Sequence, residues 1–237
     1  MIYVYALADP LAPPQDQPGL GGGALHSTVA GGVCGVYSIA DDGAPQATPE
    51  HLWQHEAVVE RIIDAGAATL PTRFGTVLSD ADELNRMLAE QADTIGAALD
   101  RVRGLVEVGV RLRLVDPPQA SAPTEDPAGE TGAGRAYLMR RLEEDRRRRE
   151  RDSTLRDTAR RVLAPLDGLA KDATAPTPSR SGEVVSTAYL VAPGDVSAFS
   201  AHVASIDAAH DGLELVATGP WPAYSFAPVL TEGTAHV

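Results

Sequence analysis

The chain is short of cysteine and lysine, with one of each, Cys34 and Lys171, among 237 residues. A single thiol excludes an intramolecular disulfide framework and a zinc site built from cysteines. The sequence also lacks an apolar run of the roughly 18 to 20 residues that a membrane span needs, and its start, MIYVYALADP, has neither the positive charge nor the apolar length of a secretory signal. These absences predict a cytoplasmic protein that does not insert into membranes.

Basic charge is scarce as well, because 20 Lys and Arg face 33 Asp and Glu, for a net charge of -13. This balance argues against a nucleic-acid partner, since phosphate backbones attract basic surfaces. Apolar residues make up 43% of the chain, which is enough for a folded core. We therefore expect a folded protein whose basic surfaces are local.

Motifs for catalysis or cofactor binding are weak. The glycines at 21–23 and 31–32 are not followed by the Lys-Ser/Thr of a phosphate-binding loop, so we predict no cofactor. His51 and His55 have a spacing of four that could chelate a metal on a helix, but no third ligand is evident. An acid/base pair of His55 with Glu56 or Glu60 is also conceivable, although polarity on a helix surface is the preferred interpretation. Cys34 lies in an apolar strand and is expected to be a buried structural thiol.

The first half of the chain predicts an α+β domain over residues 1–115. Its expected elements follow the order strand, strand, helix, strand, helix, strand, at 2–7, 32–39, 48–65, 69–71, 79–103 and 105–115. Thr48 is the expected N-cap of the first helix, whose broad apolar face would include Leu52, Val59, Ile62 and Ile63. This order suits a ferredoxin-like sheet with helices on one face, with hydrophobic and polar residues alternating in the last strand.

Residues 116–134 are rich in Pro, Gly, Ser and Thr and predict a flexible linker. Residues 135–237 predict a second α+β domain. Its expected elements are a long helix followed by a strand-helix-strand unit, at 135–169, 184–191, 196–210 and 213–218. The chain is therefore expected to fold as two domains.

The long helix carries the most unusual charge pattern of the chain. Residues 143–154 contain no apolar side chain and include the run Arg146, Arg147, Arg148 and Arg149. Acids stand four residues before arginines at five places, beginning with Glu143 and Arg147, and each such pair stabilises a helix by roughly 0.2–0.5 kcal/mol. A solvated, self-paired helix is the preferred interpretation, and a docking surface for a partner is the alternative.

Two further segments are candidate contact sites. Arg73 and Phe74 follow a proline corner, where the arginine could bind an anion or, as we prefer, pair with a carboxylate that fixes the corner. The last aromatic run, GPWPAYSF, contains Trp221, Tyr224 and Phe226, which either bury themselves at the domain junction or face a partner.

Several separated blocks together resemble a known family. In chain order they are YVY at 3–5, HEAVVE at 55–60, LPTRFGTV at 70–77, EVGVR at 107–111, AYL at 136–138 and GPWPAYSF at 219–226. This set is similar to the gas vesicle protein GvpL/GvpF family, over nearly the whole chain from residue 3 to about residue 228. Whether the chain is GvpF-like or GvpL-like stays open.

The resemblance implies an accessory or minor structural protein of gas vesicles, with a two-domain α+β fold and no enzyme activity. It implies a cytoplasmic protein associated with gas vesicles, whose partners are the small hydrophobic shell protein and other accessory proteins. In this interpretation Arg73, Phe74, the tail aromatics and the four arginines at 146–149 are the candidate partner-binding residues. The alternative is a ferredoxin-like module that binds a small ligand, or a small enzyme, which would require a cavity lined by His55 and Arg73.

Overall fold

A computed structural model describes residues 1–14, 16–40, 43, 45–115, 133–179 and 184–228. The chain divides into two compact units, and the first is discontinuous: unit 1 is Met1–Glu107 with Pro220–Val237, and unit 2 is Val108–Gly219. The mixed α+β class with two domains is confirmed. The boundary predicted at residue 115 differs from this division, because the strand expected at the end of the first domain pairs with strands of the second sheet. The C-terminal segment from Pro220, called the tail below, belongs to unit 1.

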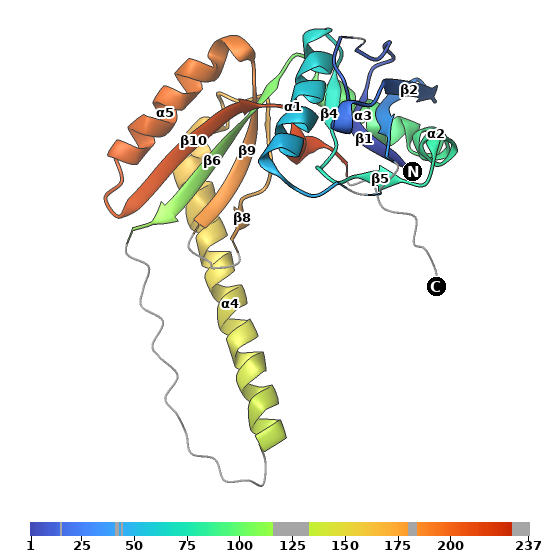
Figure 1. Ribbon diagram of the computed structural model, residues 1–237. Coiled ribbons are helices and arrows are strands. Elements are labelled where there is room, and N and C mark those ends of the chain that lie inside the picture. Colours follow the sequence, from blue (N-terminus) through green and yellow to red (C-terminus); the bar gives the residue numbers. More distant parts are fainter. Residues whose placement is uncertain (15, 41–42, 44, 116–132, 180–183, 229–237) are drawn as a thin grey trace. The chain divides into compact units, whose positions relative to one another are not determined.

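Unit 1 is built on an antiparallel sheet (Figure 1), as expected for the first domain. Its strands, in the order β2-β3-β1-β4 with β5 also paired to β1, are β1 (Ile2–Ala8), β2 (Leu25–Ala30), β3 (Val33–Ile39), β4 (Thr69–Pro71) and β5 (Val77–Leu78). Every residue of β1 is buried, because this strand is central and covered on both faces. The two strands expected at the start pair as β1 and β3, whereas β2 was missed because half of its side chains are polar and they do not alternate with the apolar ones.

Helix α1 (Pro49–Asp64) begins where the sequence predicts, with the Thr48 hydroxyl accepting a hydrogen bond from the backbone N–H of His51 at 3.2 Å. Its buried face, however, is formed by His55, Val58, Val59 and Ile62. The expected face was wrong in part, since Leu52 and Ile63 are exposed.

The long amphipathic helix expected at 79–103 is two helices, α2 (Ala81–Glu90) and α3 (Ala92–Val102). Gln91 between them has non-helical backbone angles, φ -109° and ψ 12°. The break changes the direction of the chain, so that α2 packs near β2 and β3 while α3 packs near β3 and β4. Periodicity alone hides this break because the apolar residues on both sides fit one helical repeat.

The turn between β2 and β3 offers a test of this packing. Gly31 has a positive φ of 58°, and a Cβ added there would lie 2.4 Å from the Cβ of Ala92. We expect Gly31→Ala to lower the free energy of unfolding by about 2 kcal/mol or more, from backbone strain and overpacking. Gly32→Ala is the matched control, because Gly32 has φ 80° but no atom within 4 Å of an added Cβ. Equal losses in chemical denaturation would contradict a close approach at Gly31.

Unit 2 has a second sheet of order β10-β6-β9-β7, with β8 also paired to β9. Its elements are β6 (Val106–Leu114), α4 (Ala133–Leu163), η2 (Ala164–Leu166), β7 (Asp172–Ala173), β8 (Thr177–Pro178), β9 (Val184–Val191), η3 (Pro193–Asp195), α5 (Val196–Ala208) and β10 (Leu213–Trp221). The strand-helix-strand unit and the long helix are thus confirmed. The predicted linker at 116–134 lies outside the described residues, except for its last two positions, which are helical.

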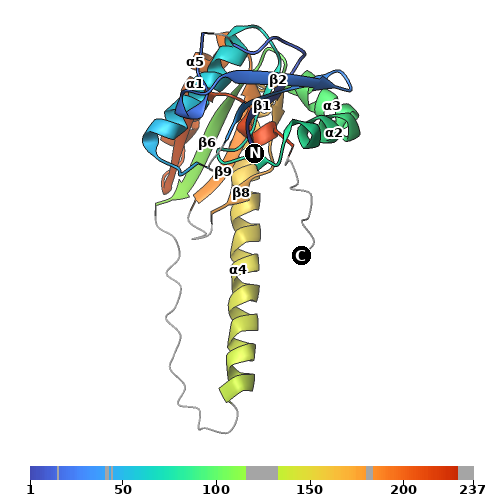
Figure 2. The same ribbon diagram turned by 45° about the vertical axis from the view of Figure 1, so that its right-hand side comes forward.

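The core of unit 2 lies between this sheet and the helices α4 and α5. Among the described side chains of α4, those of its carboxyl-terminal part contribute: Leu155, Ala159, Val162 and Leu163. Residues 137–151 of α4 are exposed, and both views show the helix running well beyond the sheet of its own unit (Figures 1 and 2). None of the helices in the described ranges is long and apolar enough to cross a membrane.

Candidate functional site

The tail binds unit 1 through polar contacts at two consecutive residues. The Tyr224 hydroxyl donates a hydrogen bond to the Glu56 carboxylate at 2.6 Å. The backbone N–H and the hydroxyl of Ser225 both donate to the Glu107 carboxylate, at 2.8 and 2.7 Å. Glu107 is only 7% exposed, so these two bonds satisfy a buried carboxylate.

The residue after Ser225 contributes a buried aromatic ring. Phe226 is 6% exposed, and the guanidinium of Arg101 lies 5.0 Å from the centre of its ring, a cation–π geometry. The short turn η4 (Tyr224–Phe226) presents all three side chains to unit 1. We call Tyr224, Ser225 and Phe226, with their partners Glu56, Glu107 and Arg101, the tail clasp.

Beneath the clasp lies an aromatic cluster of Tyr3, Tyr5, His55, Phe74 and Tyr224. The His55 ring lies 5.7 Å from Tyr3, 5.6 Å from Tyr5, 5.9 Å from Phe74 and 6.4 Å from Tyr224, between ring centres. Such ring pairs add roughly 0.5–1.5 kcal/mol each beyond the burial of area. His55 is thus the hub through which β1, the corner at Phe74 and the tail meet.

The imidazole of His55 is held neutral. It is 2% exposed, its Nδ1 is hydrogen bonded to the Tyr3 hydroxyl at 2.8 Å, and its buried Nε2 has no hydrogen bond among the described residues. Burial lowers the pKa of His55 to about 4, against a smaller opposing effect of the Thr72 backbone. The expectation that this histidine contributes polarity to a helix surface is therefore wrong.

The carboxyl group of Glu56 is also shifted. Burial raises its pKa, the hydrogen bond from Tyr224 lowers it, and the negative charge of Glu60 raises it again. The pKa of Tyr224 is raised, first by burial and then by Glu56. Tyr224 is therefore a protonated donor at neutral pH, and its bond to Glu56 is one of the contacts that hold the tail.

The corner at residues 71–77 supports the cluster. The Thr72 hydroxyl donates to the backbone carbonyl of Val4 at 2.6 Å, and the Gly75 N–H donates to the Tyr3 hydroxyl at 3.3 Å. Phe74 packs into the cluster, but the Arg73 side chain is exposed, and within the described ranges it has no ion pair. The expected pairing of Arg73 with a carboxylate is thus absent there, and the corner is fixed by hydroxyl and backbone bonds.

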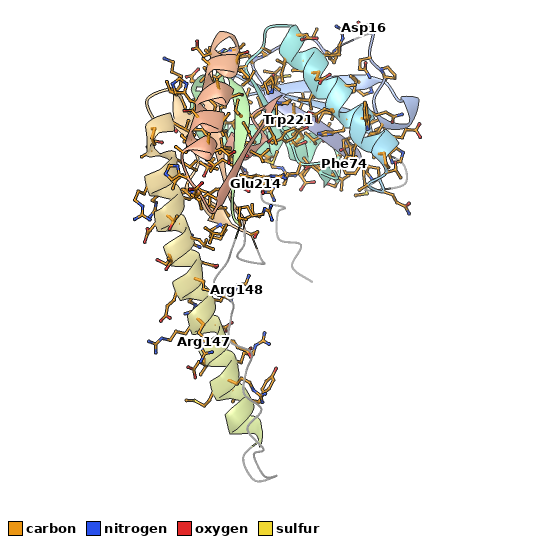
Figure 3. All side chains as sticks on the ribbon, turned by 90° about the vertical axis from the view of Figure 1, so that its left-hand side faces the viewer. Asp16, Phe74, Arg147, Arg148, Glu214 and Trp221 are labelled. Atoms are coloured by element: carbon orange, nitrogen blue, oxygen red, sulfur yellow. The ribbon has the colours of Figure 1, made fainter. Side chains whose placement is uncertain are left out.

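The arginine run lies on the exposed part of α4, where Arg147 and Arg148 stand out from the helix (Figure 3). Within the part of the chain that the structure describes, the run forms the expected ion pair of Arg147 with Glu143 at 3.2 Å and also an ion pair of Arg146 with Glu150 at 2.9 Å, which was not expected. All these groups are more than 60% exposed, and exposed pairs stabilise little. The run belongs to unit 2, so it is not part of the tail clasp.

The structure thus separates the candidate residues into internal and external ones. Tyr224 and Phe226 are used within unit 1, whereas Trp221 is 51% exposed and remains available for contact. Sequence reasoning missed the role of Glu56 and Glu107 as hydrogen-bond acceptors for the tail, since it considered Glu56 only as a possible acid/base partner of His55. Glu107 breaks the expected pattern of its strand, because it lies on the polar side of the alternation and is nevertheless buried.

The arrangement around His55 offers packing rather than an open reaction site. A neutral imidazole is enclosed by four aromatic rings, and the carboxylates of Glu56 and Glu107 are engaged by the tail. Cys34 is fully buried, as expected, and burial raises the pKa of its thiol. Within the described part of the chain, no three His, Cys, Asp or Glu residues are grouped so that they could hold a metal ion.

Comparison with known proteins gives a consistent result across the chain. The family model described as gas vesicle synthesis protein GvpL/GvpF matches residues 1–228. Gas vesicle protein L of Streptomyces sp. (strain CB03234) is 33% identical over 255 residues, covering 97% of this chain and 94% of that protein. Gas vesicle protein L of Haloferax mediterranei is 28% identical over 216 residues, covering 81% of this chain and 66% of that protein.

The fold is also found in a solved structure. The crystal structure of the gas vesicle protein GvpF from Anabaena sp. PCC7120 superposes with a TM-score of 0.66 at 21% identity, covering 99% of each chain. At this identity the likeness concerns the fold. It supports the two-unit α+β architecture described above.

Proposed function

The chain belongs to the gas vesicle GvpL/GvpF family, and from this premise we propose that it is an accessory or minor structural protein needed for gas vesicle assembly, binding the shell protein and other accessory proteins. The observation that carries the proposal is the presence of exposed contact groups outside both cores. These are Trp221 on unit 1, at 51% exposure, and the arginine run at 146–149 on unit 2. Large exposed aromatic and arginine side chains are the residues most enriched in the energetic centres of protein interfaces.

The acidic surface supports a role as a partner for a hydrophobic subunit. A net charge of -13 keeps a complex dispersed through mutual repulsion, while an exposed tryptophan supplies apolar contact. Arg73, which is exposed on unit 1, is a further candidate contact for an acidic group of a partner. Phe74, Tyr224 and Phe226 would act indirectly in this proposal, because they hold the segment that carries Trp221.

Co-expression tests this proposal. We expect the tagged chain to recover the gas vesicle shell protein of the same genome in a soluble, stoichiometric complex. Trp221→Ala and the pair Arg147→Ala with Arg148→Ala should each reduce recovery, on the order of tenfold if the residue is an interface centre. Leu169→Ala, at another exposed apolar side chain, is the control and should leave recovery unchanged. Failure of the folded wild-type chain to recover the shell protein would remove shell binding from the proposal.

The alternative of a small-ligand module or enzyme finds no supporting observation. His55 is buried among aromatic rings while the Arg73 side chain is exposed, so the two are not brought together as the lining of a site.

A further inference from the structure

The outer face of α1 carries apolar and acidic side chains that no part of unit 1 covers. We define the α1 outer face as Leu52, Trp53, Glu60, Ile63 and Asp64. Trp53, Glu60 and Asp64 lie on the side of the helix opposite its buried residues, and Leu52 and Ile63 lie at the edge of the buried side. Trp53 is 78% exposed, Leu52 44% and Ile63 37%. A tryptophan side chain that its own fold buries so little is a candidate anchor for a partner.

The acidic charge of this face is not neutralised by its neighbours. Glu60 and Asp64 stand four residues apart, a spacing at which like charges destabilise a helix. The only arginine of α1, Arg61, is ion paired with Asp16 instead. Burial raises the pKa of Glu56, and the negative charge of Glu60 raises it further. The face therefore favours a partner that combines apolar and basic groups.

Such a surface exists on the same chain, at the exposed end of α4. We define the α4 stem face as Leu138, Met139, Leu142, Arg146 and Arg149, which recur at helical spacing along one side of the helix. The three apolar side chains are 61%, 61% and 64% exposed. Arg149 has no ion pair within the described ranges, and the pair of Arg146 with Glu150 is open to solvent.

The two faces match in length, order and charge. Leu52 to Ile63 and Leu138 to Arg149 are both eleven residues apart, which is about 16 Å along each helix. Laid parallel in this register, the residues that stand level along the helices are Leu52 with Leu138, Trp53 with Met139, Glu60 with Arg146 and Ile63 with Arg149, and Asp64 lies one position beyond Arg149. Both faces are thus apolar at their first end, and the two acids of one face lie within one position of the two arginines of the other.

From this match we propose that the α4 stem face of one copy docks on the α1 outer face of a second copy. The two faces are different surfaces, so one contact leaves the α1 outer face of the first copy and the α4 stem face of the second copy free. These free faces are filled either by each other, which closes a reciprocal dimer, or by further copies, which build a ring or a filament. This proposal does not depend on shell-protein binding.

The expected association is weak and sensitive to salt. A contact between two helix faces about 16 Å long buries less area than a standard interface, which buries about 800 Å² on each partner. Its charged half is exposed and therefore screened by salt, with a Debye length of about 8 Å at physiological ionic strength. Sedimentation velocity of the wild-type chain should show a mean mass that rises with concentration and falls with added salt.

Charge reversal on the two faces separates this contact from any other. The variant E60R/D64R changes the α1 outer face, and the variant R146E/R149E changes the α4 stem face. We expect each variant alone to associate at least tenfold more weakly than the wild type. A mixture of the two should recover association, because the unchanged arginines of the first variant meet the unchanged acids of the second, and the two reversed faces also complement each other.

The control variant R140E/R151E has the same change of net charge as R146E/R149E but alters the opposite side of α4, so it should associate like the wild type. A wild-type chain whose mass does not change with concentration would overturn the proposal, and so would association that survives both reversals. Loss in each variant without recovery in the mixture would overturn it as well, since general charge repulsion would then be the cause.

Discussion

Replacing Glu107 with alanine is expected to lower the free energy of unfolding of unit 1 by about 2–3 kcal/mol and to release the tail. The carboxylate accepts two hydrogen bonds from Ser225, at 2.8 and 2.7 Å, and hydrogen bonds to charged groups contribute about 1.5–3 kcal/mol each. The expected loss is smaller than the sum of two such hydrogen bonds, because water can hydrogen bond to the exposed Ser225 once the carboxylate is gone. Both tryptophans, Trp53 and Trp221, lie in unit 1, so intrinsic fluorescence during denaturation follows this unit.

Ser225→Ala is the matched variant. It removes only the hydroxyl bond and leaves the backbone N–H donating to Glu107, so we expect a loss of about 1 kcal/mol. The double variant should lose little more than Glu107→Ala alone, since both changes break one interaction. Limited proteolysis should cut the tail of Glu107→Ala faster than that of the wild type. An unchanged unfolding midpoint in Glu107→Ala would show that the tail is held by Phe226 and Tyr224 without it.

The hidden role of Glu107 illustrates what an alternating pattern can and cannot predict. Alternation places Glu107 on the polar side of β6 together with Arg111 and Arg113, and those two arginines are indeed exposed. The strand crosses from unit 1 to unit 2 between Glu107 and Val108, so its first residues meet a different environment from the rest. The partner of Glu107 is 118 residues away in sequence, and no local pattern encodes such a pairing.

The same limit explains why the domain boundary predicted at residue 115 differs from the division into two units. A linker rich in proline and glycine after residue 115 is a sound local signal for the end of a domain. The strand before it, β6, nevertheless pairs with β10. Just beyond the paired strands Val115 donates to the Gly212 carbonyl at 2.9 Å, and Arg113 is ion paired with Glu214. Strand pairing depends on contacts between residues far apart in the sequence, and an amphipathic strand fits the edge or centre of either sheet.

The elements with strong local signals were predicted well. The N-cap of α1, the solvated middle of α4 and the strand-helix-strand unit follow from caps, charge and apolar periodicity. The aromatic tail was recognised as a contact segment, but its division into inward and outward residues depends on where the acceptors Glu56 and Glu107 lie. His55 was misjudged for a related reason, because a polar residue in a helix is placed outside unless its buried partner, here Tyr3, is known.

Acid should destabilise unit 1 through His55. The pKa of this residue is about 4 in the folded protein and 6.5 in the unfolded chain, so the unfolded state binds more protons between these values. Stability that is fully present above pH 6.5 is therefore lost as the pH falls to about 4. The difference corresponds to about 3 kcal/mol at 1.36 kcal/mol per pH unit. Urea denaturation at several pH values, followed by tryptophan fluorescence, measures the slope.

Glu56 acts in the opposite sense. Its pKa is raised in the fold, so its protonation favours the folded state at low pH and offsets part of the loss caused by His55. His55→Gln isolates the histidine: whatever its effect on stability at neutral pH, its slope between pH 6.5 and 4 should be flatter than that of the wild type. His202→Gln, at an exposed histidine of unit 2, should keep the wild-type slope. Identical slopes in the wild type and His55→Gln would mean that the imidazole is protonated in the folded state without cost, and that the aromatic cluster does not hold it neutral.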